Sequence, residues 1–105
     1  MNDVWVEVCT DQDIAIEDVM RFDHNNRTFA IYHTSDGKYY ATDGLCTHAK
    51  VHLSGGFVMD NTIECPKHNG RFEIPTGKAK GAPACIDLKT YPVKCEAGKI
   101  FLNLA

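Results

Sequence analysis

Apolar and polar residues alternate along most of the chain, and this period of two predicts β-strands. In the first half, the alternating stretches are residues 5–9, 19–22, 27–34 and 38–42, which are rich in β-branched and aromatic side chains. The longest of them places Phe29 and Ile31 on one face and Tyr32 on the other. No stretch of useful length has the 3.6-residue period of an amphipathic helix, so the pattern favours an all-β protein.

Turn-forming residues separate these predicted strands. Residues 23–26 (Asp, His and two Asn) form a turn cluster, because Asn and Asp tolerate positive φ. The dipeptide Asp36-Gly37 is typical of a tight β-hairpin. The acidic stretch 11–18 keeps Ile14 and Ile16 two positions apart, so we expect an extended segment there, with a short helical turn as the alternative.

The pattern changes after Asp43-Gly44, where loops rich in Gly, His and Cys begin. The predicted elements of the second half are a tight hairpin of 57–59 and 62–64, a short strand at 71–74, an irregular crossing at 75–83, and a terminal hairpin of 89–96 and 99–104. We therefore predict one domain over residues 1–105, a small antiparallel β-sandwich with a lobe inserted at roughly 43–81.

Two short segments carry the candidate chemistry, Cys46-Thr47-His48 and Cys65-Pro66-Lys67-His68. The hairpin between them brings two thiols and two imidazoles together as a four-ligand metal site. Such a site suits one zinc ion, or a [2Fe–2S] cluster with two Cys on one iron and two His on the other. The alternating order of Cys and His favours the cluster, and zinc or a chance arrangement remain the alternatives.

The neighbouring residues make the likeness more specific, and the chain resembles the Rieske ferredoxins, small electron carriers of bacterial multicomponent oxygenase systems. The matching segments are Cys46-Thr47-His48, Leu53-Ser54-Gly55-Gly56, residues 64–73, Thr76-Gly77-Lys78-Ala79, Pro83 and Tyr91-Pro92-Val93. The resemblance implies the Rieske fold and one [2Fe–2S] cluster held by Cys46, His48, Cys65 and His68. It also implies that the free edge of each His faces solvent as the exit route of the electron.

The resemblance implies a role as well. A Rieske ferredoxin shuttles single electrons from a flavin-dependent NAD(P)H reductase to the Rieske centre of a terminal aromatic-ring-hydroxylating dioxygenase, and it is not itself an enzyme. A cluster domain or subunit of an enzyme and a structural zinc module are the alternatives. High-potential relatives add a disulfide and two hydroxyl groups near the cluster, but here those positions hold Val51, Lys67, Gly70 and Phe72. The resemblance therefore predicts a low potential for a Rieske centre.

Composition excludes several other classes. The formal net charge of −3 and the lack of a basic stripe argue against nucleic-acid binding. No apolar run approaches the ~20 residues that span a bilayer, and the N-terminus has no secretory pattern, so we expect a soluble, cytoplasmic protein, most simply a monomer. In that reducing compartment Cys9, Cys85 and Cys95 are expected to be small apolar core residues rather than disulfide partners.

One further histidine invites a ligand role. His52 follows His48 by only four residues. The four-ligand set is complete without it, so we predict that His52 does not bind iron.

Overall fold

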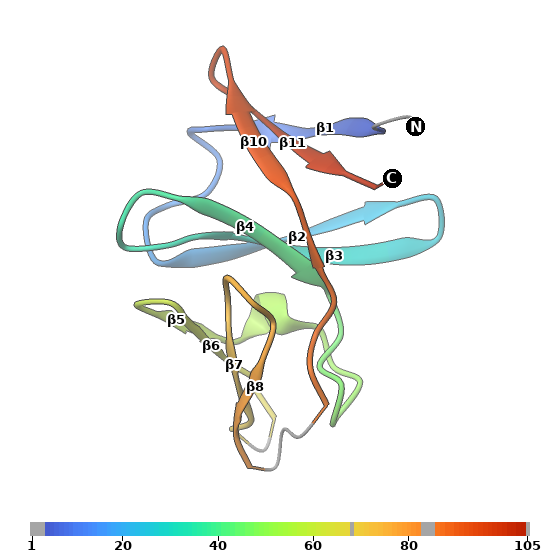
Figure 1. Cartoon of the computed structure of the whole chain (residues 1–105), viewed down its shortest axis with the longest axis vertical. Coiled ribbons are helices and arrows are strands. Elements are labelled where there is room, and N and C mark those ends of the chain that lie inside the picture. Colours follow the sequence, from blue (N-terminus) through green and yellow to red (C-terminus); the bar gives the residue numbers. More distant parts are fainter. Residues whose placement is uncertain (1–3, 68, 83–85, 105) are drawn as a thin grey trace.

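The computed structural model describes residues 4–67, 69–82 and 86–104, and strands dominate it (Figure 1). In chain order, the elements are β1 Trp5–Thr10, β2 Asp18–His24, β3 Arg27–His33, β4 Tyr39–Asp43, the 3₁₀ turn η1 Leu53–Gly55, β5 Phe57–Met59, β6 Thr62–Glu64, β7 Arg71–Glu73, β8 Ala79–Gly81, β9 Thr90–Tyr91, β10 Val93–Glu96 and β11 Lys99–Asn103. The all-β prediction is confirmed. Within these ranges no helix has the length and apolar character needed to cross a bilayer.

The strands form three antiparallel sheets, which lie one above another in Figure 1. The first has the order β1-β11-β10, the second β2-β3-β4-β9, and the third β5-β6-β7-β8. The first two sheets pack together as the predicted sandwich, which we call the base, around a core of Ile14, Phe29, Ile31, Ala41, Tyr91, Ile100 and Leu102. The third sheet and the loops that join it to β4 form the lobe (residues 44–81).

Strand β3 is the wall that base and lobe share. Its residues Phe29 and Ile31 point into the base core, while Ala30 and Tyr32 point to the opposite side, because side chains alternate along a strand. There they join a second core that includes Leu53 and other lobe residues. All four β3 side chains are fully buried. The lobe therefore packs against the outer face of the middle sheet.

The predicted hairpins are present. Asn25 and Asn26 have φ of 49° and 64°, so they alone form the tight turn, and β2 continues to His24 inside the predicted turn cluster. The terminal hairpin turns at Ala97 and Gly98, with φ of 53° and 76°. Positive φ at both positions suits the right-handed twist of the flanking strands.

Three predictions of secondary structure need correction. Residues 75–83 were predicted to be irregular, but β8 forms there as the edge strand beside β7. The predicted strand 89–96 is divided at Pro92, so β9 pairs with β4 whereas β10 pairs with β11. Pro92 has no N–H to continue a ladder, and its carbonyl accepts from the Asn103 N–H at 2.9 Å. The acidic stretch 11–18 forms turns rather than an extended segment up to the start of β2.

The cysteines outside the metal motif behave differently from one another. Cys95 is exposed near the end of β10, so the prediction that it lies in the core is wrong. Cys95 pairs with the buried Ile100, so it lies on the core side of β10, but it is exposed because it is near the end of this edge strand. Cys9 is half-buried on β1, and burial, with Asp13 nearby, raises the pKa of its thiol to about 11. Cys85 lies outside the described residues.

Candidate metal centre

Two loops of the same construction carry the predicted ligands. At the base of the first loop Leu45 pairs with His52, and the Cys46 N–H donates to the Val51 carbonyl at 2.8 Å. At the base of the second loop Glu64 pairs with Arg71, and the Cys65 N–H donates to the Gly70 carbonyl at 2.7 Å. In each loop a cysteine comes first, and its N–H bonds to the carbonyl five residues later. The two thiols therefore occupy equivalent positions.

Each loop turns back through a residue with left-handed backbone. Lys50 has φ of 58° and Asn69 has φ of 59°, and each lies four residues after its cysteine. Asn adopts this conformation readily, whereas Lys rarely does, because its Cβ crowds the following carbonyl. The left-handed backbone of Asn69 could be predicted from its residue type. The left-handed backbone of Lys50 could not be predicted from its residue type.

The two thiols are buried and adjacent. Cys46 is 1% exposed and Cys65 is fully buried, and both belong to the lobe core. Burial raises the pKa of the Cys65 thiol, and so does its hydrogen bond with Cys46, while a hydrogen bond from the Lys67 backbone N–H opposes the shift. An opposing backbone donor favours the thiolate, the form that binds metal. Because the two thiols are in contact, both sulfur atoms can bind the same iron.

The imidazoles are placed differently. His48 is exposed in the turn of the first loop, and His68 lies outside the described residues. No group of three or more His, Cys, Asp and Glu side chains in the described part of the chain gathers closely enough to hold a metal ion. Two adjacent buried thiols fit the half of a Rieske cluster in which both cysteines bind the same iron.

A third segment supports the first loop. The Thr47 hydroxyl donates to the Ile86 carbonyl at 2.6 Å, which ties the loop to the chain that enters β9. Sequence reasoning did not select Thr47, because its partner lies 39 positions away. Leu45 and Ile86 remain 40% and 62% exposed beside this contact. The surface next to His48 therefore has apolar side chains that are available to a partner.

Both ring nitrogens of His52 are already used by the protein. Its Nδ1 accepts from the Ser54 N–H at 3.0 Å, and its Nε2 lies 2.8 Å from the Thr28 hydroxyl. Partial burial, followed by the charge of Arg21, lowers the pKa of this imidazole. These contacts support the prediction that His52 is not an iron ligand.

One of the two adjacent glycines between the loops is required by close packing. A Cβ on Gly56 would lie closer than 3.0 Å to the Glu64 carbonyl oxygen, whereas a Cβ on Gly55 would have its nearest neighbour, Pro66 Cγ, at 3.7 Å. Glu64 directly precedes Cys65, so Gly56 permits the segment that leaves the first loop to pack against the strand that enters the second.

Comparison with known proteins adds family and fold. The Rieske [2Fe–2S] domain family matches residues 4–92. The ferredoxin component of the naphthalene 1,2-dioxygenase/salicylate 5-hydroxylase systems of Ralstonia sp is 41% identical over 104 residues, which are 99% of either chain. The ferredoxin component of the naphthalene 1,2-dioxygenase system of Pseudomonas putida is 41% identical over 101 residues, which are 96% of either chain.

Solved structures give the same result. The ferredoxin of Sphingomonas yanoikuyae B1 superposes with a TM-score of 0.90 at 33% identity, covering 97% of this chain and all of the other. A chain of the complex between reduced oxygenase and oxidized ferredoxin in carbazole 1,9a-dioxygenase has a TM-score of 0.90 at 29% identity, covering 97% of this chain and 94% of the other. The predicted antiparallel fold is thus confirmed.

Proposed function

The chain belongs to the Rieske [2Fe–2S] domain family, and we propose that it carries single electrons from a flavin-dependent NAD(P)H reductase to the Rieske centre of a terminal oxygenase. Its relatives are ferredoxin components of dioxygenase systems, so the protein is an electron carrier and not an enzyme, and its cofactor is a Rieske-type [2Fe–2S] cluster. The observation that supports the proposal most directly is the pair of adjacent buried thiols at equivalent positions of two equivalent loops.

We assign the ligands as in the sequence prediction: Cys46 and Cys65 hold one iron, and His48 and His68 hold the other. When bound, the cluster supplies reversible one-electron transfer. The protein contributes burial of the two sulfur atoms, which excludes water from them. It also contributes an exposed position for His48, which shortens the path to a partner's redox centre.

The partner surface follows from the same geometry. We infer that the terminal oxygenase contacts the face around His48, where Leu45 and Ile86 offer apolar contact area. A ferredoxin with the same fold is found in complex with the oxygenase of carbazole 1,9a-dioxygenase. The reductase must reach the same redox centre, so we expect the two partners to compete for this face. We further infer a single domain over residues 1–105, a monomer and a cytoplasmic location.

Metal analysis tests the cofactor assignment. Protein purified anaerobically should contain two iron and two acid-labile sulfide per chain and be red-brown. Cys46→Ala or Cys65→Ala removes an anionic ligand and should abolish the cluster, whereas His48→Cys supplies a thiolate and should retain a cluster of lower potential. One zinc per chain without sulfide would overturn the assignment.

Electron transfer tests the role. With NADH and a ferredoxin reductase of a naphthalene dioxygenase system, the visible absorption should bleach reversibly and recover when oxidised oxygenase is added. The relatives are components of such systems, which makes these proteins suitable probes. Conversion of an aromatic substrate by the isolated protein with a chemical reductant would contradict the carrier role.

A further inference from the structure

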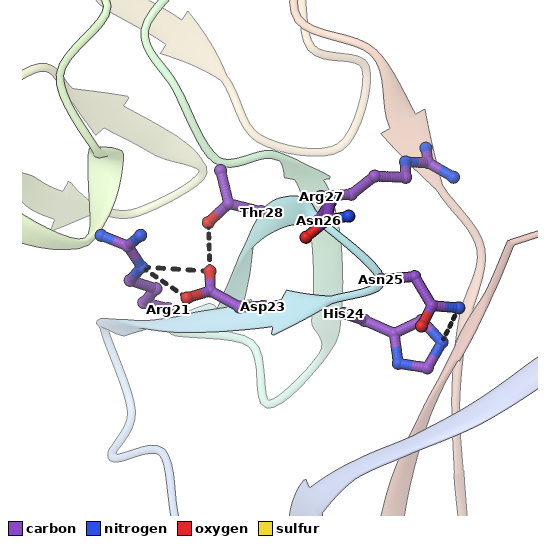
Figure 2. Close-up of a pocket in the computed structure, with 7 residues that line it drawn as sticks. All are labelled: Arg21, Asp23, His24, Asn25, Asn26, Arg27 and Thr28. Carbon is purple, nitrogen blue, oxygen red and sulfur yellow. Dashed lines mark hydrogen bonds and ion pairs between the residues drawn. The ribbon is translucent and has the colours of Figure 1, made fainter.

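A chain of hydrogen bonds joins the first ligand loop to the β2–β3 hairpin of the base. His52 Nε2 lies 2.8 Å from the Thr28 hydroxyl, which donates to Asp23 Oδ1 at 2.6 Å. Arg21 Nε then contacts both oxygens of Asp23, at 3.1 and 3.2 Å. Figure 2 shows the Asp23 carboxylate between Thr28 and Arg21 at one side of the shallow pocket that this hairpin lines.

The direction of every proton in this chain is determined. A backbone N–H can only donate, so the bond from Ser54 requires an unprotonated Nδ1 on His52. The neutral ring therefore carries its proton on Nε2 and donates it to Thr28, whose own proton goes to the carboxylate. The Thr28 hydroxyl is thus both acceptor and donor, and the tautomer of His52 is fixed.

The His52 ring is held closely against the chain that enters the first loop. A Cβ on Gly44 would lie 2.5 Å from His52 Nε2 and 3.1 Å from the Phe29 backbone nitrogen, so only glycine leaves room for the ring. The Gly44 N–H donates to the Thr28 carbonyl at 3.0 Å, and its carbonyl accepts from the Leu53 N–H at 2.8 Å. The ring, the hydroxyl and this backbone therefore form one contact between base and loop.

This contact lies next to the ligands without including any of them. His52 follows Val51, whose carbonyl closes the loop on Cys46, and it pairs with Leu45 on the other side. Through Ser54 it also caps η1, the turn that leads from the first loop toward β5. Displacement of His52 would move both the base of the first loop and the path to the second.

We propose that His52 is a positioning residue that acts through Thr28 and Asp23 to fix the first ligand loop relative to the base and to the second loop. The proposal rests on the proposed function for its significance, since a loop that is held firmly retains the cluster and keeps its ligand geometry constant. His52 itself binds neither iron nor a partner in this role.

The chain of hydrogen bonds from His52 through Thr28 to Asp23, which we call the relay, can be tested by substitution of Thr28, because this side chain touches no proposed ligand. In Thr28→Val the hydroxyl is replaced by a methyl group of similar size, so the His52 N–H and the Asp23 carboxylate both lose a partner. We expect the Cys46 amide to exchange with solvent deuterium about tenfold faster, which corresponds to ~1.4 kcal/mol and is within the net contribution of the two lost hydrogen bonds. Cluster loss to an iron chelator should accelerate by a similar factor.

Two further variants separate positioning from general stability. Thr28→Ser keeps the hydroxyl and should restore both rates to within about twofold of wild type. Thr34→Val is the matched control, because the Thr34 hydroxyl also donates to an aspartate, Asp36, but at the other end of β3, roughly 20 Å away at ~3.3 Å per residue. It should leave the exchange of the Cys46 amide unchanged at matched global stability.

Coupling provides the decisive comparison. In the double variant Thr28→Val with His52→Ala, the two effects on amide exchange should not add, because both substitutions break the same series of hydrogen bonds. The single variant His52→Ala should still bind two iron per protein chain. Unchanged exchange in Thr28→Val, failure of Thr28→Ser to rescue, or full additivity would overturn the proposal. Absence of a cluster from the wild-type protein would instead contradict the proposed function, and amide exchange of the metal-free protein would still report on the relay.

Discussion

Substitution of Gly56 by alanine is the sharpest steric test of how the two ligand loops are held together. The backbone of Gly56, with φ −91° and ψ −165°, is open to any residue, so the added methyl group causes no conformational strain. Its Cβ would nevertheless approach the Glu64 carbonyl oxygen to less than 3.0 Å. The backbone fixes the position of the Cβ, and the oxygen belongs to the main chain, so no side-chain rotation relieves the contact. The two segments must separate by on the order of 1 Å to restore van der Waals distance.

That separation has a cost that can be bounded. Overpacking of this kind destabilises proteins by ~1–3 kcal/mol, and a clash between a Cβ and a main-chain oxygen belongs at the upper end. The movement also strains the bond from the Gly56 N–H to the Leu53 carbonyl, 2.9 Å long, and the pairing of Phe57 with Glu64. We therefore expect a loss of about 2–3 kcal/mol in the free energy of unfolding, with less iron bound per chain.

The neighbouring Gly55 provides the control. A Cβ there meets only Pro66, at 3.7 Å or more, which is ordinary contact. Gly55→Ala should therefore be neutral or should stabilise by ~0.4–1 kcal/mol through the unfolded chain. Urea denaturation of both variants, with iron analysis, measures the difference. Equal stabilities of the two variants, or a larger loss in Gly55→Ala, would refute the steric argument.

Three further outcomes are expected. Protein-film voltammetry at neutral pH should give a midpoint below about 0 mV, and a value above about +150 mV would contradict the resemblance to low-potential carriers. Phe72→Tyr, a change in the core that holds both thiols, should raise the midpoint by roughly 60 mV if the hydroxyl bonds to sulfur, and no change would mean that it does not. Burial lowers the pKa of His52 in the folded protein, so the unfolded chain takes up a proton at this imidazole at higher pH than the folded protein does. Wild type should therefore lose stability relative to His52→Gln as the pH falls below about 6.5, and the loss should be complete below the pKa of the folded protein. Parallel urea midpoints of the two proteins from pH 7 to 5 would disprove that linkage.

Local chemistry accounts for what the sequence could predict. The dipeptide Asp36-Gly37 and the glycine of Ala97-Gly98 favour hairpins by their own backbone preferences, and the structure has strands on either side of both turns. The pairs Cys46 with His48 and Cys65 with His68 are recognisable because metal ligands need particular atoms at short spacing. Such features depend on neighbours within a few residues.

The remaining features depend on contacts that are distant in the sequence. Alternation continues through Pro92, so periodicity alone does not reveal that the chain changes sheets there. Strand β8 contains residues of low β-propensity and forms because β7 offers it an edge. The relay from His52 to Thr28 spans 24 positions, and no motif marks either residue. In each case tertiary packing determines the result.

Strand β3 contributes side chains to both the base core and the lobe core, and the stability of these two cores depends on the cofactor to different degrees. The base core contains no proposed ligand, whereas the lobe core includes Cys46 and Cys65 among its buried residues. Local opening follows such boundaries when contiguous cooperative units differ in stability. In the absence of iron, we therefore expect the base to stay folded while the lobe opens locally on a faster timescale. Ala30 and Tyr32 would lie at the boundary between these two parts. The cluster would then assemble in a protein whose base is already folded and whose lobe is mobile, and binding of the cluster would order the lobe.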